Sequence, residues 1–372
     1  GVTAYVVETT AAGTAAIAVL EVVGPDAMDA IARAFGPCLL GPNRPLHTMI
    51  ADGDGELDDV VLAFRPPEES MTGWPHVEIQ CHGSPAIVKR VRRALVAVGV
   101  KPAPRTFLLR TAVRNRRMTR LEEEAWLAAM SAHTERAANE LFEQRKRLPA
   151  LAGKIGDTRD RELLVRLIKV SVYGCALAIP RTIVVVGRPN SGKSSIVNAL
   201  AGRERVLVDC REGTTRDLVR ISAAIEGVPI QLVDTAGLRD SDDAVERDGV
   251  EMTRSAVRSA TTVLHVVDAT NPFPHDPLPP TRHAISVWNK VDVMSPSRLP
   301  AEAIGVSATT GQGLDELAMR ILKSIGADRR QDVEGTFLFK VRQLNRAVEL
   351  SHASDAEWRE RWERWVWGRA RH

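Results

Sequence analysis

A glycine-containing stretch, Gly187 to Ser194, carries the residue types that hold a polyphosphate. It reads Gly-Arg-Pro-Asn-Ser-Gly-Lys-Ser and fits the pattern GxxxxGK followed by Ser or Thr. Glycines let the backbone N–H groups wrap an anion, Lys193 can reach the β- and γ-phosphates, and the Ser194 hydroxyl can bind Mg²⁺. The alternative for this stretch alone is a plain glycine turn. The residues expected to line the site are Asn190, Ser191, Gly192, Lys193, Ser194 and Ser195.

Two later segments carry groups suited to a magnesium ion beside a γ-phosphate. The sequence Gly-Thr-Thr-Arg-Asp supplies Thr214 and Thr215, of which we favour Thr215 as a Mg²⁺ ligand. The sequence Leu-Val-Asp-Thr-Ala-Gly ends an apolar run with Asp234, which can hold Mg²⁺ through water. The N–H of Gly237 can then face the γ-phosphate.

The sequence Asn289-Lys290-Val291-Asp292 contains groups that can identify the base of a nucleotide. The Asp292 carboxylate can accept two hydrogen bonds from the N1–H and N2–H₂ groups of guanine, and adenine offers no such donor pair. A wrong base would leave the carboxylate unpaired, at a cost of about 1–3 kcal/mol. We therefore expect GTP and GDP rather than ATP, with Asn289 and Lys290 in the site and Ser307 and Ala308 behind the base.

Leu238 follows Gly237 at the position where Ras-like GTPases place a glutamine that orients the attacking water. A leucine side chain has no polar group and cannot orient water. Another group must therefore do so.

Strands and helices must position these motifs. The β-branched run Ile183 to Val186, directly before the glycine-containing stretch, is typical of a strand buried on both faces, and a helical pattern follows over Ser195 to Leu200. Strand and helix patterns then alternate to about Ile325, which predicts a doubly wound α/β unit with a mostly parallel sheet. The further strands are expected at Ile230–Val233, Thr262–Val267 and Ala284–Trp288.

The whole chain of 372 residues is expected to contain four segments. An N-terminal α/β domain covers 1–106, a helical domain 107–179, the motif-bearing domain 180–327 and a C-terminal helical segment 328–372. In the helical domain, Glu, Arg, Ala and Leu are frequent and glycines few, as helices require.

Local patterns within these segments predict individual elements. Strands are expected at Val6-Val7, Ile17–Leu20 and Val60–Phe64, and a helix at Pro85–Val98. Pro149 and Gly153 to Gly156 are expected to interrupt the helices of the second segment. In the tail, core packing is favoured over base stacking for three tryptophans at helical spacing: Trp358, Trp362 and Trp365.

Composition excludes several classes of protein. Hydrophobic residues at 44% and charged residues at 26% are ordinary globular values, so a disordered or fibrous chain is not expected. The net charge of +3 is too small to predict a nucleic-acid partner. Four widely spaced cysteines without a CxxC pair indicate a reducing cytosol. The apolar stretch Val170–Pro180 is too short to span a membrane, so we expect no membrane association.

The motifs together resemble the tRNA modification GTPase MnmE (TrmE) family. The resemblance rests on the glycine-containing stretch, on Gly-Thr-Thr-Arg-Asp, on Asp-Thr-Ala-Gly-Leu-Arg-Asp-Ser-Asp-Asp-Ala-Val-Glu-Arg, and on the segments Pro66–Gly83 and Glu124–Ala138. It implies a P-loop GTPase domain inserted after an N-terminal dimerising α/β domain and a helical domain. It further implies that Glu246 orients the attacking water, that Arg239 is the switch arginine, and that Asn190 binds a K⁺ ion. Lys193, together with Mg²⁺ and K⁺, is expected to stabilise the charge that develops on the phosphate oxygens.

The resemblance also implies partners and a cellular role. Members of this family take part in modification of the wobble uridine of tRNA, as homodimers that work with an MnmG-like flavoprotein. The family's 5-formyltetrahydrofolate loop reads Ala11-Ala12-Gly13-Thr14-Ala15-Ala16 here, which counts against folate binding. The family's terminal Cys-x-Gly-Lys is also missing from the end of the chain, Trp367 to His372. A regulatory GTPase switch that modifies no tRNA is therefore the alternative.

Overall fold

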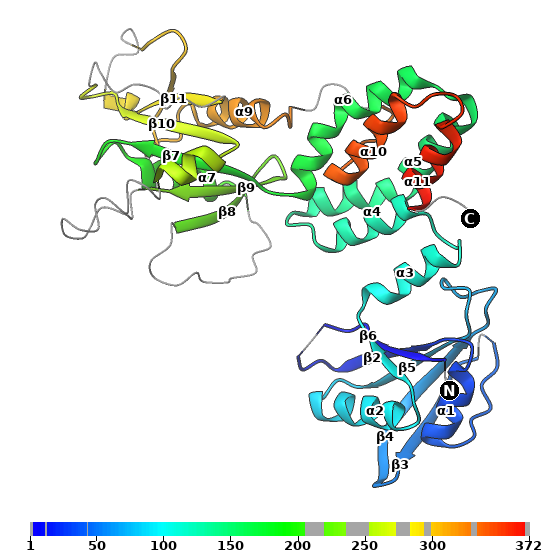
Figure 1. Ribbon diagram of the computed structural model, residues 1–372. Helices are drawn as coiled ribbons and strands as arrows, with labels where there is room; N and C mark the ends of the chain where they lie inside the picture. Colours follow the sequence, from blue (N-terminus) through cyan, green and yellow to red (C-terminus); the bar gives the residue numbers. More distant parts are fainter. Residues whose placement is uncertain are drawn as a thin grey trace. The chain divides into compact units, whose positions relative to one another are not determined.

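The computed structural model describes residues 3–11, 13–42, 44–204, 219–235, 253–272, 283–293, 299–328 and 333–368. The chain divides into two compact units, Gly1–Glu123 and Glu124–His372 (Figure 1). Within the described residues, none of the helices combines the length and the apolar character that a bilayer crossing needs.

The first unit is built on a six-stranded sheet in the order β3-β4-β5-β2-β1-β6. Neighbouring strands are antiparallel except β1 and β6, which run parallel. The strands are β1 (Tyr5–Glu8), β2 (Ile17–Val23), β3 (Leu46–Asp52), β4 (Gly55–Arg65), β5 (His76–His82) and β6 (Lys101–Ala103). The three strands predicted for this unit are confirmed as β1, β2 and β4.

Helices α1 (Ala27–Phe35), α2 (Pro85–Ala97) and α3 (Thr106–Arg114) complete the first unit. A cluster of fully buried side chains from the sheet and from α1 and α2 forms its main core, with members that include Leu20, Ile31, Leu62, Ile79 and Leu95. Leu108 of α3 packs with Val7 and Val23 in a second cluster. The predicted helix Pro85–Val98 is confirmed as α2, whose C-cap is Val98.

The second unit contains a helical part and an α/β part. The helices of the first are α4 (Arg120–Met130), which begins just before the unit, α5 (Glu135–Thr158), α6 (Arg161–Ala178), α10 (Val341–Ser351) and α11 (Trp358–Trp367). Helix α10 lies beside α6 and α11, so the end of the chain returns to the helices that precede the α/β part (Figure 1). Trp358 and Trp365 are buried and Trp362 is partly buried, which confirms core packing for the tail.

The expected interruption at Pro149 and Gly153 to Gly156 is wrong, because α5 runs through both positions. Proline removes one helical hydrogen bond, yet the helix continues past Pro149 and packs against a tail side chain three residues further on. The indole of Trp362 donates to the Ala152 carbonyl at 2.7 Å, and a Cβ added to Gly156 would lie 2.3 Å from that ring. Gly156 therefore permits the close approach of a tail side chain and does not end the helix.

The α/β part is a six-stranded sheet in the order β12-β11-β10-β7-β9-β8. Its strands are β7 (Arg181–Gly187), β8 (Val219–Ile225), β9 (Val228–Asp234), β10 (Thr262–Asp268), β11 (Ala284–Asn289) and β12 (Ile304–Val306), with helices α7 (Lys193–Ala201) and α9 (Leu314–Ser324). All pairs are parallel except β8 with β9. The mostly parallel, doubly wound sheet is confirmed, together with the buried run Ile183 to Val185. Strands β8 and β12 were not predicted.

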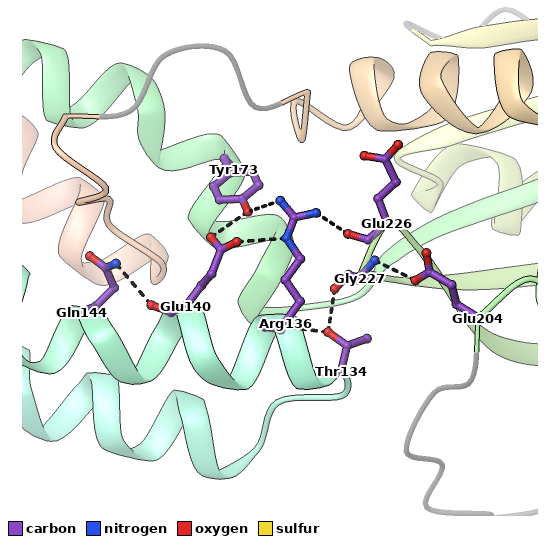
Figure 2. Close-up of polar contacts among 9 residues, drawn as sticks. Thr134, Arg136, Glu140, Gln144, Tyr173, Glu204, Glu226 and Gly227 are labelled. Carbon is purple, nitrogen blue, oxygen red and sulfur yellow. Dashed lines mark hydrogen bonds and ion pairs between the residues drawn. The ribbon is translucent and has the colours of Figure 1, made fainter.

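The β8–β9 hairpin meets the start of α5 at its turn (Figure 2). Glu226 and Gly227 form this turn with φ angles of +47° and +72°, the conformation of a two-residue type I′ hairpin. The Thr134 hydroxyl donates to the Gly227 carbonyl at 2.6 Å. Arg136 donates to the Glu226 carbonyl and, at 2.9 Å, to Glu140. The helical part thus holds the hairpin through its backbone.

Candidate functional site

The glycine-containing stretch forms the connection from β7 to α7, at the carboxyl edge of the parallel sheet. Two of its glycines are required by close approaches. A Cβ on Gly187, whose φ is +149°, would lie 2.2 Å from the Val266 carbonyl oxygen, and one on Gly192, at φ +88°, would lie 2.1 Å from the Asn289 side-chain nitrogen. The loop is therefore pressed against β10 on one side and against the end of β11 on the other.

Polar groups of this loop suit a phosphate. The Ser191 hydroxyl is buried and has no hydrogen-bond partner within the described residues. Helix α7 starts at Lys193, so its free N–H groups and partial positive charge face the loop. The buried Lys193 ammonium donates to the Arg188 carbonyl at 2.9 Å, so it lies across the same loop. A polyphosphate fits this combination of donors.

Two of the three predicted Mg²⁺ ligands, Ser194 and Asp234, lie within the described residues. Asp234 ends β9 and is buried beside Val185 of β7, while Ser194 is exposed on the first turn of α7. No group of three or more His, Cys, Asp or Glu side chains in the described part of the chain could hold a metal ion. One carboxylate, one hydroxyl and phosphate oxygens suit Mg²⁺, which keeps several waters. The remaining predicted residues, Thr214, Thr215, Gly237, Arg239 and Glu246, lie outside the described residues.

Asn289 connects the base motif to the phosphate loop. The residue is 3% exposed, and its side-chain amide nitrogen donates to the Ser191 carbonyl at 3.1 Å. Its amide oxygen accepts from the backbone N–H of Ala308, also at 3.1 Å. One buried amide thus brings together three motifs, with Ser191 lying 98 residues before Asn289 and Ala308 lying 19 residues after it.

The remaining base-side residues lie around this amide. Ser307 is fully buried and accepts from the Thr310 N–H at 3.1 Å, which shapes the loop behind the expected base. Asp292 is exposed on the short 3-10 helix Val291–Val293. Its carboxylate is open to solvent and can receive a guanine edge.

Asp268 is part of this site although sequence reasoning did not select it. Its carboxylate accepts from the Lys290 ammonium at 2.5 Å, and the same ammonium donates to the Asn190 carbonyl at 2.9 Å. Burial alone would raise the pKa of Asp268, but hydrogen bonds from Lys290 and Thr270 outweigh it and lower the pKa. A carboxylate directly at the end of a buried strand was the available signal. The predicted strand stopped one residue earlier, at Val267.

A pocket of about 330 Å³ opens where these elements meet, and it is lined by residues of the phosphate loop and of the end of β10. Asn190, Ser191 and Asp268 are among the residues that line it. The pocket, the donors around it and the Asn289 link make up a site for a nucleotide carrying several phosphates.

Comparison with known proteins identifies the family. The model for the GTP-binding protein TrmE N-terminus matches residues 5–117, and that for the 50S ribosome-binding GTPase matches 182–293. The tRNA modification GTPase MnmE of Xanthomonas campestris pv. campestris (strain B100) is 32% identical over 94% of this chain and 88% of its own length. The protein of the same name from Bordetella parapertussis is 34% identical over 85% of this chain and 80% of its own. The chain therefore belongs to the tRNA modification GTPase MnmE family.

Proposed function

We propose that this chain hydrolyses GTP to GDP and phosphate at the pocket lined by the phosphate loop after β7 and by the end of β10, as the GTPase step of tRNA wobble-uridine modification. The single observation that carries the proposal is the Asn289 amide, which ties the phosphate loop to the base motif and to Ala308. This link supports simultaneous binding of a phosphate chain and a guanine.

The proposed chemistry divides among the site residues. A water oxygen attacks the γ-phosphorus in line, the bond to the β–γ bridging oxygen breaks, and the proton leaves with the phosphate product. Lys193 stabilises the charge that develops on the phosphate oxygens. Glu246, with Arg239 nearby in sequence, orients the water in place of the missing glutamine. The ligands we propose are Ser194, Thr215 and Asp234 for Mg²⁺, and Asn190 for K⁺.

We also propose partners, domain boundaries and a cellular location for this chain. We propose a homodimer formed through the N-terminal domain, an MnmG-like flavoprotein partner and tRNA as the modified substrate. The curated relatives' printed name, tRNA modification GTPase, supports this role. Residues 1–106, 107–179, 180–327 and 328–372 are the proposed domains. A cytosolic location suits the widely spaced cysteines.

The test is base-selective hydrolysis. Purified protein with Mg²⁺ and K⁺ should cleave GTP and leave ATP, and Asp292→Asn should shift the preference from guanine to xanthine nucleotides. Undiminished GTP binding by Asp292→Asn would refute the base pocket. Loss of wobble-uridine modification in cells that lack the gene would support the tRNA role, and normal modification would favour a regulatory switch.

A further inference from the structure

Asp268 lies between the two strands that carry the nucleotide motifs, although it belongs to neither motif. In the parallel sheet, Val266 of β10 pairs with Gly187, where the phosphate loop begins. On the other side Asp268 itself pairs with Asn289, where the base motif begins. A side chain at this position can contact both motifs.

The contacts of Asp268 use both carboxylate oxygens. Oδ1 accepts from the Thr270 backbone N–H at 2.9 Å and from the Thr270 hydroxyl at 2.6 Å. Oδ2 accepts from the Lys290 ammonium at 2.5 Å. The carboxylate is therefore held in one orientation by its own strand end and presents a fixed negative charge to Lys290.

Lys290 extends the connection to the phosphate loop. Its ammonium also donates to the Asn190 carbonyl at 2.9 Å. Both Lys290 and Asn190 have left-handed backbones, with φ angles of +69° and +63°. Such conformations are uncommon outside glycine and persist only where surrounding contacts hold them. The ammonium that joins the two residues is such a contact.

We propose that Asp268 is a positioning residue for the guanine nucleotide. Its carboxylate fixes the Lys290 ammonium, which in turn holds the phosphate loop at the distance from the base motif that a bound nucleotide requires. This inference rests on the proposed function, because it concerns the same pocket. Asp268 acts through Lys290 and is not itself a catalytic residue, so its loss changes nucleotide retention more than it changes the chemical step.

The experiment measures release of a fluorescent GDP analogue from the full chain by rapid mixing with excess GDP. Asp268→Asn should release it about tenfold faster, the effect expected of losing one charged hydrogen bond. The matched control is Asp315→Asn, which removes an exposed ion pair with Arg203 in the same α/β part. The control should release the analogue at the wild-type rate.

Two further readouts separate positioning from a general structural effect. Without nucleotide, the thermal unfolding midpoint of Asp268→Asn should lie slightly below that of Asp315→Asn, because Asp268 accepts bonds from Lys290 and Thr270, while GDP should raise the midpoint of Asp268→Asn less. In steady-state hydrolysis, the KM for GTP should rise by a larger factor than kcat falls. Equal release rates for wild type and Asp268→Asn would overturn the inference, as would a loss of nucleotide-free stability that accounts for the whole effect.

A second variant keeps the test decisive if Asp268→Asn does not fold. Thr270→Val removes one donor to the carboxylate but keeps the charge, and it should accelerate release in the same direction by a smaller factor. Wild-type release from Thr270→Val would then overturn the inference. Failure of the wild-type protein to bind any guanine nucleotide would instead overturn the proposed function, so the two failures are distinguishable.

Discussion

Replacing Gly227 by alanine tests whether the helical part holds the β8–β9 hairpin. At φ +72°, an alanine is strained by about 1–2 kcal/mol, partly offset because alanine restricts the unfolded chain. The new Cβ would also lie 2.6 Å from the Cβ of Arg136, an atom that cannot move without its helix. We therefore expect Gly227→Ala to separate the hairpin turn from α5 (Figure 2).

The magnitude follows from the contacts that would be lost. Separation weakens the Thr134 bond to the Gly227 carbonyl and the Arg136 bond to the Glu226 carbonyl. A neutral hydrogen bond contributes about 0.5–1.5 kcal/mol and one to a charged group about 1.5–3 kcal/mol. Added to about 1 kcal/mol of net backbone strain, the free energy of unfolding should fall by about 3–5 kcal/mol.

The matched control is Gly311→Ala. Gly311 has a φ of +84°, and a Cβ there would have no heavy atom within 4 Å. This variant carries the backbone strain without the clash, so its unfolding free energy should fall by only about 1 kcal/mol. Urea unfolding of the nucleotide-free protein measures both. Equal losses for the two variants would refute the reasoning, since the contact with α5 would then contribute nothing.

Three further predictions concern the nucleotide site and the first unit. Glu246→Ala should keep GTP affinity and lose most of its turnover, measured by phosphate release; unchanged turnover would remove Glu246 from the mechanism. Gly192→Ala places a methyl group 2.1 Å from the Asn289 amide nitrogen. The affinity for GDP, measured by titration calorimetry, should therefore fall at least about tenfold. An unchanged affinity would contradict the role of the phosphate loop in binding GDP. The hydrogen bond that the protonated His82 imidazole donates to the Asp58 carboxylate, followed by the charge of that carboxylate, raises the pKa of His82 above 6.5. Its stabilising contribution is therefore fully present below pH 6.5 and is lost as the pH rises through the raised value. A proton NMR titration should show the pKa of His82 returning toward 6.5 in Asp58→Asn, and an identical value in both proteins would exclude the pairing.

Predictions of the α/β part from sequence succeeded where the local pattern has one physical solution. A β-branched run such as Ile183 to Val186 can bury both of its faces only inside a sheet, and the glycine-containing stretch then has to turn toward α7. The base motif stays a prediction from chemistry alone, because the Asp292 carboxylate has a hydrogen-bonding pattern that guanine matches. These features depend on neighbours in sequence.

Other features depended on contacts that no local pattern contains. Pro149 reads as a helix breaker, yet α5 continues through it, and Trp362 of the tail packs against the same helix at Ala152 and Gly156. Strand β8 was missed because its sequence, Val-Arg-Ile-Ser-Ala-Ala-Ile, contains two alanines, which are depleted in strands. Antiparallel pairing with β9 makes this segment a strand and accompanies burial of its last three residues.

The sequence by itself determined which residues could hold a guanine nucleotide, because the residue types and short spacings of each motif define its chemistry. Only the tertiary structure decided how the motifs are joined. Asn289 reaches Ser191, and Asp268 reaches Asn190 through Lys290, because parallel strands far apart in the chain end side by side. Spatial proximity of this kind arises from sheet order, which is set by the packing of the whole unit and not by any one segment.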